Sequence, residues 1–310
     1  MNLSLKMFIA LLCVFSLCSS CKEKMTEDEI LTIGIAPCRK PAAFIQTLGF
    51  DPNRSAYSTE TDRYKGVILI QAPATETDTI RKYQHPSWSK FGYMASITTD
   101  DLGNAYTFPV PFINTENQTI QTLNSIFKID HSSGEMTLFT TLPKTDSVKD
   151  MVAYGLLGVY FDCHAKKIYV SSVNGSTRDK ENGSLFVLDQ STGKVLDRLD
   201  GVDAMGLCVG GVTGEKKLYF GKARTPEVYT VELDKEGMFD GKPEFAISLD
   251  QLGPRGDDKA RRIRFNTKSE LVIHGIEFNF NLAGQSIKPE TKYAFGYNRE
   301  EKKWLLMSTE

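Results

Sequence analysis

Few side chains in this sequence have the types and spacing that catalysis requires. Its four histidines are scattered along the chain, and neither a G-x-S-x-G nucleophile motif nor an H-E-x-x-H zinc motif occurs. We expect His131 and His164 to lie in solvated hairpin turns. His85 and His274 are candidates for a binding surface, and for His274 a packed or hydrogen-bonded structural role is the alternative.

The sequence also contains paired carboxylates, which can hold a metal ion or act as general acid and base. Asp100–Asp101 and Asp257–Asp258 are two such pairs, and neither lies in a calcium-binding loop motif. We interpret both pairs as solvated turns. The sequence therefore predicts no catalytic residue, no metal ligand and no cofactor.

Three cysteines, Cys38, Cys163 and Cys208, follow the N-terminal segment considered below. An odd number allows at most one disulfide, and no C-x-x-C pair is present for a zinc site. Cys163 and Cys208 fall in apolar, strand-like runs, so we expect buried free thiols there. Whether any two of the three are bonded is left open by the sequence.

The N-terminal residues are typical of an export signal. Lys6 precedes the apolar run Met7–Leu17, which is too short to span a bilayer permanently. The small residues before Cys21 resemble the lipobox of bacterial lipoproteins, where the cysteine carries lipid after cleavage; an ordinary secretory signal is the alternative. We assign 1–20 to a lipoprotein signal peptide, 21–30 to a charged tether anchored through Cys21, and 31–310 to a single domain.

Beyond residue 30 the chain shows short alternating runs typical of β-strands and no convincing amphipathic helix. Outer hairpins are predicted around turns at 132–134, 191–193, 234–237 and 298–301. An inner hairpin precedes each of them, with turns at 103–104, 165–166, 213–215 and 266–268. A looser first copy joins 66–70 to 80–83, which gives five repeats in all.

Equivalent positions in the inner hairpins carry Tyr106, Tyr169, Tyr219 and Val272, which are 50 to 63 residues apart. Two hairpins make a four-stranded unit that cannot bury both of its faces alone, whereas several units packed radially can. The sequence therefore predicts an all-β fold, a β-propeller of four-stranded blades. Five repeats are visible, and six blades are possible if residues 30–50 supply another. A β-sandwich or jelly roll is the alternative.

The repeat pattern over residues 30–308 resembles the six-bladed propeller lipoproteins of Bacteroidetes. More distantly, it is similar to NHL-repeat and gluconolactonase-like (SMP-30) propellers. The latter resemblance implies a divalent cation at the mouth of the central channel. The first expected strand, Ile33–Pro37, lacks the acidic Glu-Gly-Pro signature of that group, so no metal ligand is carried over.

Insertions at 49–65, 109–124, 174–182 and 280–292 are expected between the second and third strands of their repeats, on the face that also carries the links between blades. Ligands of propellers normally bind on that face. Aromatic and charged residues there suit a small molecule, a glycan or a protein partner; capping of the blade ends is the alternative role. The candidates are Trp88, Lys90, Tyr93, Asp150, Tyr154, Asp203, Arg261, Arg262 and His274.

The composition narrows the classes of function. Hydrophobic residues make up 41% and charged residues 25%, which excludes a collagen, a coiled coil or a mostly disordered chain. A net charge of −2 from 37 basic and 39 acidic residues argues against a nucleic-acid partner. We expect the protein to contact a membrane only through its lipid anchor.

Our leading hypothesis is therefore a non-enzymatic, lipid-anchored β-propeller of the cell envelope. It would be held at the outer membrane, on the periplasmic or the surface side, and would bind a ligand or protein partner. A metal-dependent lactonase-like hydrolase and a structural scaffold in an envelope complex are the alternatives.

Overall fold

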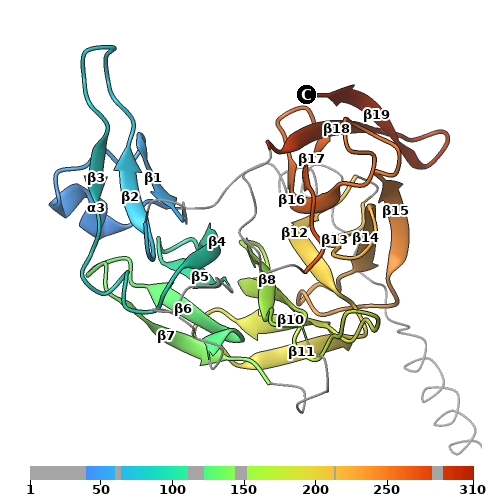
Figure 1. The fold of residues 1–310 in the computed structure, drawn as a ribbon, viewed down its shortest axis with the longest axis horizontal. Coiled ribbons are helices and arrows are strands. Elements are labelled where there is room, and N and C mark those ends of the chain that lie inside the picture. Colours follow the sequence, from blue (N-terminus) through green and yellow to red (C-terminus); the bar gives the residue numbers. More distant parts are fainter. Residues whose placement is uncertain (1–39, 60–63, 111–121, 144–151, 213, 281–288) are drawn as a thin grey trace, which may run out of the picture.

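A computed structural model describes residues 40–59, 64–110, 122–143, 152–212, 214–280 and 289–310. In these residues the strands form five antiparallel sheets, one of three strands and four of four, which are the blades of a β-propeller (Figure 1). The predicted signal peptide and tether lie outside the described residues. Within the described part of the chain, no helix is both long and apolar enough to cross a membrane.

Each sheet is built from strands that are consecutive in sequence. The first contains β1 (Ser55–Ser58), β2 (Ile68–Gln71) and β3 (Arg81–Tyr83). The second contains β4 (Met94–Thr99), β5 (Ala105–Pro109), β6 (Ser125–Ile129) and β7 (Met136–Thr141). The third contains β8 (Leu156–Asp162), β9 (Lys167–Ser172), β10 (Ser184–Asp189) and β11 (Val195–Asp200).

The last two sheets repeat the same order. The fourth contains β12 (Ala204–Gly210), β13 (Lys217–Lys222), β14 (Glu227–Glu232) and β15 (Glu244–Ser248). The fifth contains β16 (Lys259–Phe265), β17 (Leu271–Ile276), β18 (Thr291–Asn298) and β19 (Lys303–Thr309). The predicted double hairpins and the equivalence of Tyr106, Tyr169, Tyr219 and Val272 are confirmed, because all four residues lie on the second strand of a sheet.

The first sheet differs from the others. Its last strand, β3, leads into β4 as β7 leads into β8, so β1 to β3 correspond to the second, third and fourth strands of a blade. An innermost strand for this blade is not among the described residues. One departure from the predicted pattern is a short helix, α3 (Ala43–Thr47), whose Phe44 and Ile45 are buried against the first two sheets.

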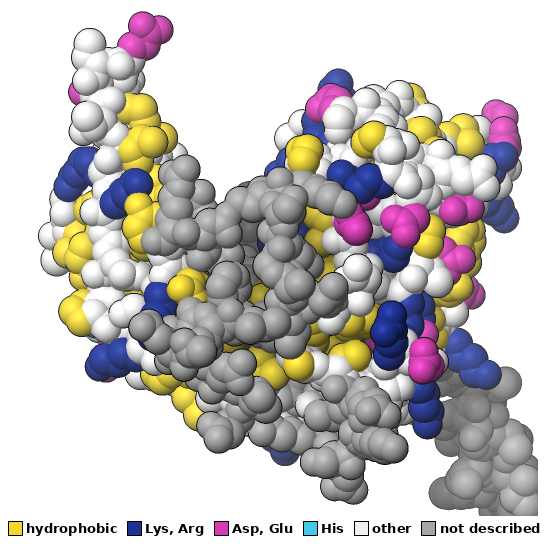
Figure 2. Space-filling model, in the orientation of Figure 1, with side chains coloured by type: hydrophobic (Ala, Val, Ile, Leu, Met, Phe, Trp, Pro, Cys, Tyr) yellow, Lys and Arg dark blue, Asp and Glu magenta, His cyan; other side chains and the backbone are white. Residues whose placement is uncertain are grey.

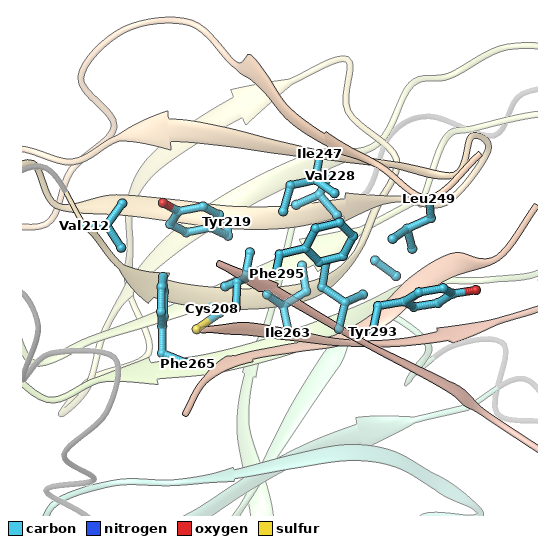
Figure 3. Packing of buried hydrophobic residues seen from close by; sticks show 13 residues of the cluster. Cys208, Val212, Tyr219, Val228, Ile247, Leu249, Ile263, Phe265, Tyr293 and Phe295 are labelled. Carbon is cyan, nitrogen blue, oxygen red and sulfur yellow. The ribbon is translucent and has the colours of Figure 1, made fainter. Parts of the chain in front are cut away.

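The sheets follow one another around an arc, and the first and last lie apart at its two ends (Figure 1). Contacts between innermost strands join β4 to β8, β8 to β12 and β12 to β16. Each pair of neighbouring sheets encloses its own apolar cluster. Figure 3 shows the cluster between the fourth and fifth sheets, where Tyr219, Val228, Phe265 and Phe295 interdigitate. Side chains alternate between two such clusters along a strand, so both faces of the inner sheets are buried.

Buried donors link each of the first three sheets to the outer hairpin of the next one. Trp88 Nε1 donates to the Gly134 carbonyl at 2.7 Å, and Tyr169 Oη donates to the Gly237 carbonyl at 2.8 Å. Tyr106 Oη donates to the Gln190 carbonyl at 3.4 Å. These bonds satisfy polar groups inside an apolar interface and set the register of one blade against its neighbour.

Asp100 is not the solvated turn residue that the sequence suggested. Its side chain is fully buried and accepts hydrogen bonds from the Leu102 and Asn104 amides and from Asn104 Nδ2, Tyr106 Oη and Gln190 Nε2. Burial by itself raises the pKa of this carboxyl, but the hydrogen bonds outweigh burial and the pKa is lowered. Asp100 therefore fastens the β4–β5 turn to the third sheet.

The cysteines also differ from expectation. Cys208 is the buried free thiol that was predicted, but Cys163 is disulfide-bonded. The cysteine to which Cys163 is joined lies outside the described residues. We expected a free thiol at Cys163 because it falls in an apolar, strand-like run of the sequence. That expectation was wrong, because a cysteine next to an apolar strand can be either free or disulfide-bonded.

Glycines allow the innermost strands to approach each other closely. A Cβ atom at Gly158 of β8 would overlap the Met205 carbonyl oxygen of β12. A Cβ at Gly206 of β12 would lie 2.7 Å from the Arg261 carbonyl oxygen of β16. A larger residue at either position would push two blades apart where they converge.

We predict that Gly158→Ala lowers the free energy of unfolding by about 1–3 kcal/mol, because the added methyl group meets backbone that cannot move independently. Denaturant unfolding measures this loss. Gly296→Ala is the matched control: Gly296 is also a strand glycine, and a Cβ there would meet only the flexible Met307 side chain, with its Sδ 3.2 Å away. Equal losses for the two variants would contradict this account of Gly158.

Candidate functional site

The links between blades and the loops between second and third strands lie at one end of the sheets, as the strand order requires. We call this end the link face. The predicted insertions at 109–124, 174–182 and 280–292 fall there. The segment 49–65 was predicted to be such an insertion throughout, and this is only partly correct, because residues 55–58 in its middle form strand β1.

Three of the predicted residues meet around a carboxylate that was not predicted, Glu290. Arg261 Nη1 lies 3.3 Å from Glu290 Oε1, Arg262 Nη2 donates to Glu290 Oε2, and His274 Nδ1 lies 3.2 Å from the same oxygen. Arg261 and Arg262 belong to the innermost strand β16, and His274 faces Arg262 across the β16–β17 pair. The side chains of Arg261 and Arg262 are 52% and 61% exposed, so solvent reaches both guanidinium groups.

This cluster controls the protonation of Glu290. The contact with His274 and the hydrogen bond and charge of Arg262 lower the pKa of Glu290 to about 2, against the opposing effect of burial. Glu290 is therefore an anion at neutral pH. Two guanidinium groups share this one carboxylate, so the cluster has a formal excess of one positive charge even with His274 neutral.

Asp203 forms a second group at the link face, but it is buried and not open to a ligand. Its carboxylate accepts hydrogen bonds from Ser176 Oγ and from the Gly183 amide, and Arg224 Nε lies 2.6 Å from its Oδ2. Arg224 also donates to the carbonyl oxygens of residues 177, 178 and 180. Asp203 and Arg224 therefore hold the 174–182 loop on the fourth sheet, which is a positioning role.

Aromatic side chains lie beside this ion pair. Tyr154 packs edge to face against Phe278 and Phe280, with ring centres 5.5 and 5.9 Å apart. The Arg224 guanidinium stands 5.1 Å from the centre of the Phe280 ring. Met205, next to Gly206, belongs to the same apolar cluster as Tyr154 and Phe278. Gly206 packs against the backbone of Arg261. Strand β12 therefore lies between the aromatic group and β16, the strand that carries Arg261 and Arg262.

Three of the remaining candidates lie on the link between the first and second sheets. Trp88 is fully buried between the first two sheets, where it packs and donates to Gly134, so its observed contacts are those of a core residue. Lys90 is exposed and Tyr93 is partly exposed on the link between the first and second sheets. Asp150 lies outside the described residues. The described candidates of blades three to five therefore fall into two groups on the link face, one around Glu290 and one around Asp203.

Asp258 repeats the arrangement of Asp203 one blade later. It also precedes an innermost strand, is fully buried, and is held by Arg255 and by Tyr293 Oη, 2.8 Å from its Oδ2. Burial alone raises the pKa of Asp258, but these hydrogen bonds outweigh it and the pKa is lowered. The expectation of a solvated turn was therefore wrong for Asp258, whereas the side chain of Asp257 is 63% exposed.

Sequence reasoning missed Glu290, Arg224 and Phe278 as members of this surface. Glu290 lies inside the predicted 280–292 insertion. The prediction that this insertion lies on the link face was therefore the signal from which Glu290 could have been found. Nothing in the local pattern around Arg224 distinguishes it from other charged residues at strand ends. Its partner Asp203 is 21 positions away in sequence, and the pairing of β12 with β13 within the fourth sheet brings the two side chains together.

The arrangement around Glu290 is suited to binding an anion. Half-exposed guanidinium groups form strong charge-assisted hydrogen bonds with carboxylates and sulfates. Among the described residues no group of three His, Cys, Asp or Glu side chains is placed to hold a metal ion. A shallow pocket lined by Glu215, Lys217 and Tyr297 lies near the hairpin turns at the opposite end of the sheets.

Comparisons with known protein families and with curated proteins find no match in sequence. Several solved structures are similar in fold. Kuenenia stuttgartiensis hydrazine synthase is 14% identical with a TM-score of 0.48, over 83% of this chain and 72% of that one. A nidogen/laminin complex is 12% identical with a TM-score of 0.44, over 79% and 89%. The Dos1 propeller is 13% identical with a TM-score of 0.39, over 77% and 59%.

The Glu290 cluster gives a pH-dependent prediction. A carboxyl whose pKa falls from about 4.5 to about 2 on folding adds stability above pH 4.5 that is lost as the pH falls toward 2. We expect Glu290→Gln to lower the free energy of unfolding at pH 7, and this difference from the unmodified protein to shrink between pH 4.5 and 2. Glu300→Gln, in an exposed turn, is the control and should change little. A Glu290→Gln difference that is constant over this range would contradict the assignment.

Proposed function

We propose that this protein is an exported, lipid-anchored binding protein that holds an anionic ligand on the link face of blades three to five. The observation that carries the proposal is the exposed pair Arg261 and Arg262, which share the single carboxylate of Glu290. An incoming carboxylate or sulfate would satisfy the excess positive charge of this cluster. The ligand class we favour is an acidic glycan.

Two features support export and anchoring. The first is the sequence around Cys21, with its short apolar run and small residues before the cysteine. The second is the disulfide at Cys163, because stable structural disulfides form in oxidising compartments such as the bacterial periplasm and are rare in the cytosol. Both features favour a location in the cell envelope.

The ligand class is tested with two sugars of the same chain length that differ in charge. We expect the purified full-length protein to bind an oligogalacturonate more tightly than the same oligosaccharide with its carboxyl groups reduced to alcohols, by isothermal titration calorimetry. Replacing Arg262 by Gln should weaken binding of the acidic sugar about tenfold or more, because one charge-assisted hydrogen bond is lost.

Arg198→Gln is the control for charge, since Arg198 is an exposed arginine on the outer strand β11 that pairs with Asp200. This variant should bind as the unmodified protein does. Equal affinity for the acidic and the reduced sugar, or equal weakening by Arg198→Gln and Arg262→Gln, would refute an anion site at the Arg261–Arg262 pair.

Lipid anchoring makes a separate prediction at two neighbouring cysteines. In a bacterial host grown with an alkyne-bearing fatty acid, the full-length protein should become labelled and partition into detergent. Cys21→Ser should abolish the label, whereas Cys18→Ser should retain it, because only the first residue after cleavage carries lipid. Labelling that survives in Cys21→Ser would show that Cys21 is not the anchor.

A further inference from the structure

The outermost strand of the last blade, β19, carries an unusual apolar surface. Leu305, Leu306 and Met307 follow one another and are 37%, 41% and 63% exposed. Hydrophobic side chains reach the surface over this part of the molecule in Figure 2. The outer strands of the other four-stranded blades each carry one exposed large apolar residue: Leu138 on β7, Leu196 on β11 and Phe245 on β15. Three in succession are typical of a surface that is covered by a partner.

The backbone of β19 is also available for pairing. β19 is the edge strand of its sheet, so the N–H and C=O groups along its free side have no partner strand in that sheet. It contains seven residues, none of them proline, and no charge between Trp304 and Thr309. By contrast, the edge strand β11 carries Asp197, Arg198 and Asp200, which discourage pairing with another chain.

The charges at the two ends of β19 indicate what kind of strand fits. Lys302 immediately precedes the strand, whereas Lys303, its first residue, forms an ion pair with Glu301 in the preceding turn. Glu310 follows the strand; its side chain is 64% exposed and pairs with Lys292 at 2.5 Å on the neighbouring strand β18. An antiparallel copy of the same strand, centred on Leu306, would place its Glu310 beside Lys302 and its Leu305–Met307 segment beside the same three residues. The strand is therefore complementary to itself in both charge and hydrophobicity.

We propose that β19 pairs antiparallel with β19 of a second copy of this chain. The two last blades then form one continuous sheet across a two-fold axis near Leu306, which satisfies the free edge and buries the exposed apolar residues. This pairing is independent of the proposed ligand site. It uses the outer rim of the propeller and leaves Arg261 and Arg262, on the innermost strand, open.

Cross-linking at the two-fold axis tests the pairing. Two differently tagged copies of full-length Leu306→Cys are co-expressed in the same cells, mildly oxidised and separated without reductant. We expect a disulfide-linked dimer that contains both tags, at least tenfold more abundant than for Leu138→Cys. Leu138 is the matched control because it is a similarly exposed leucine on the outer strand of another blade.

A second measurement does not depend on an engineered cysteine. Co-purification of the two tagged copies should be lost with Leu306→Lys and kept with Leu138→Lys, and both variants should retain the thermal unfolding transition of the unmodified protein. The proposal is overturned if Leu306→Cys gives no dimer, links chiefly to a different protein, or if Leu306→Lys folds normally and still co-purifies with its differently tagged copy.

Discussion

The close approach of the innermost strands is the constraint on which the rest of this propeller depends. At Gly158 and Gly206 one blade's strand meets the backbone of the next, and there is no room for a side chain. Further from the centre the sheets diverge, and aromatic and branched side chains fill the widening space in one cluster per interface. Between the third, fourth and fifth sheets, the small residues inside and the large ones outside together set the wedge shape of the interfaces that continue the arc in Figure 1.

Buried polar contacts then fix how the blades are aligned. Asp203 and Asp258 stand just before innermost strands, and each is neutralised by an arginine. Burying a carboxylate is costly unless it is paired and fully hydrogen-bonded, so these residues tolerate few alternative arrangements. They hold the loops of the link face in place. Glu290, in contrast, is contacted by arginines that remain half exposed, and this difference separates the proposed binding cluster from its supports.

The two proposed surfaces use different parts of the blade. An anion would bind beside the innermost strand of the fifth sheet, where positive charge is in excess, whereas a second copy would pair with the outermost strand of that sheet. A dimer formed in this way presents two ligand sites. If the chain is anchored through Cys21, both sites lie on one membrane-bound assembly, and binding to a repeating polymer gains from the two sites acting together.

The sequence by itself determined the repeat, because turn residues and alternating apolar positions are local properties: the double hairpins, the second-strand tyrosines and the link face were all predictable. The tertiary structure alone decided which candidates meet. Trp88, an aromatic in a link, became a core residue, and Asp258, in an apparent turn, became a buried ion pair. Glu290 was recognisable only as a loop residue until the fold placed it between Arg261 and Arg262. Those contacts join residues 28 and 29 positions apart, and such separations are set by the packing of strands and not by local sequence.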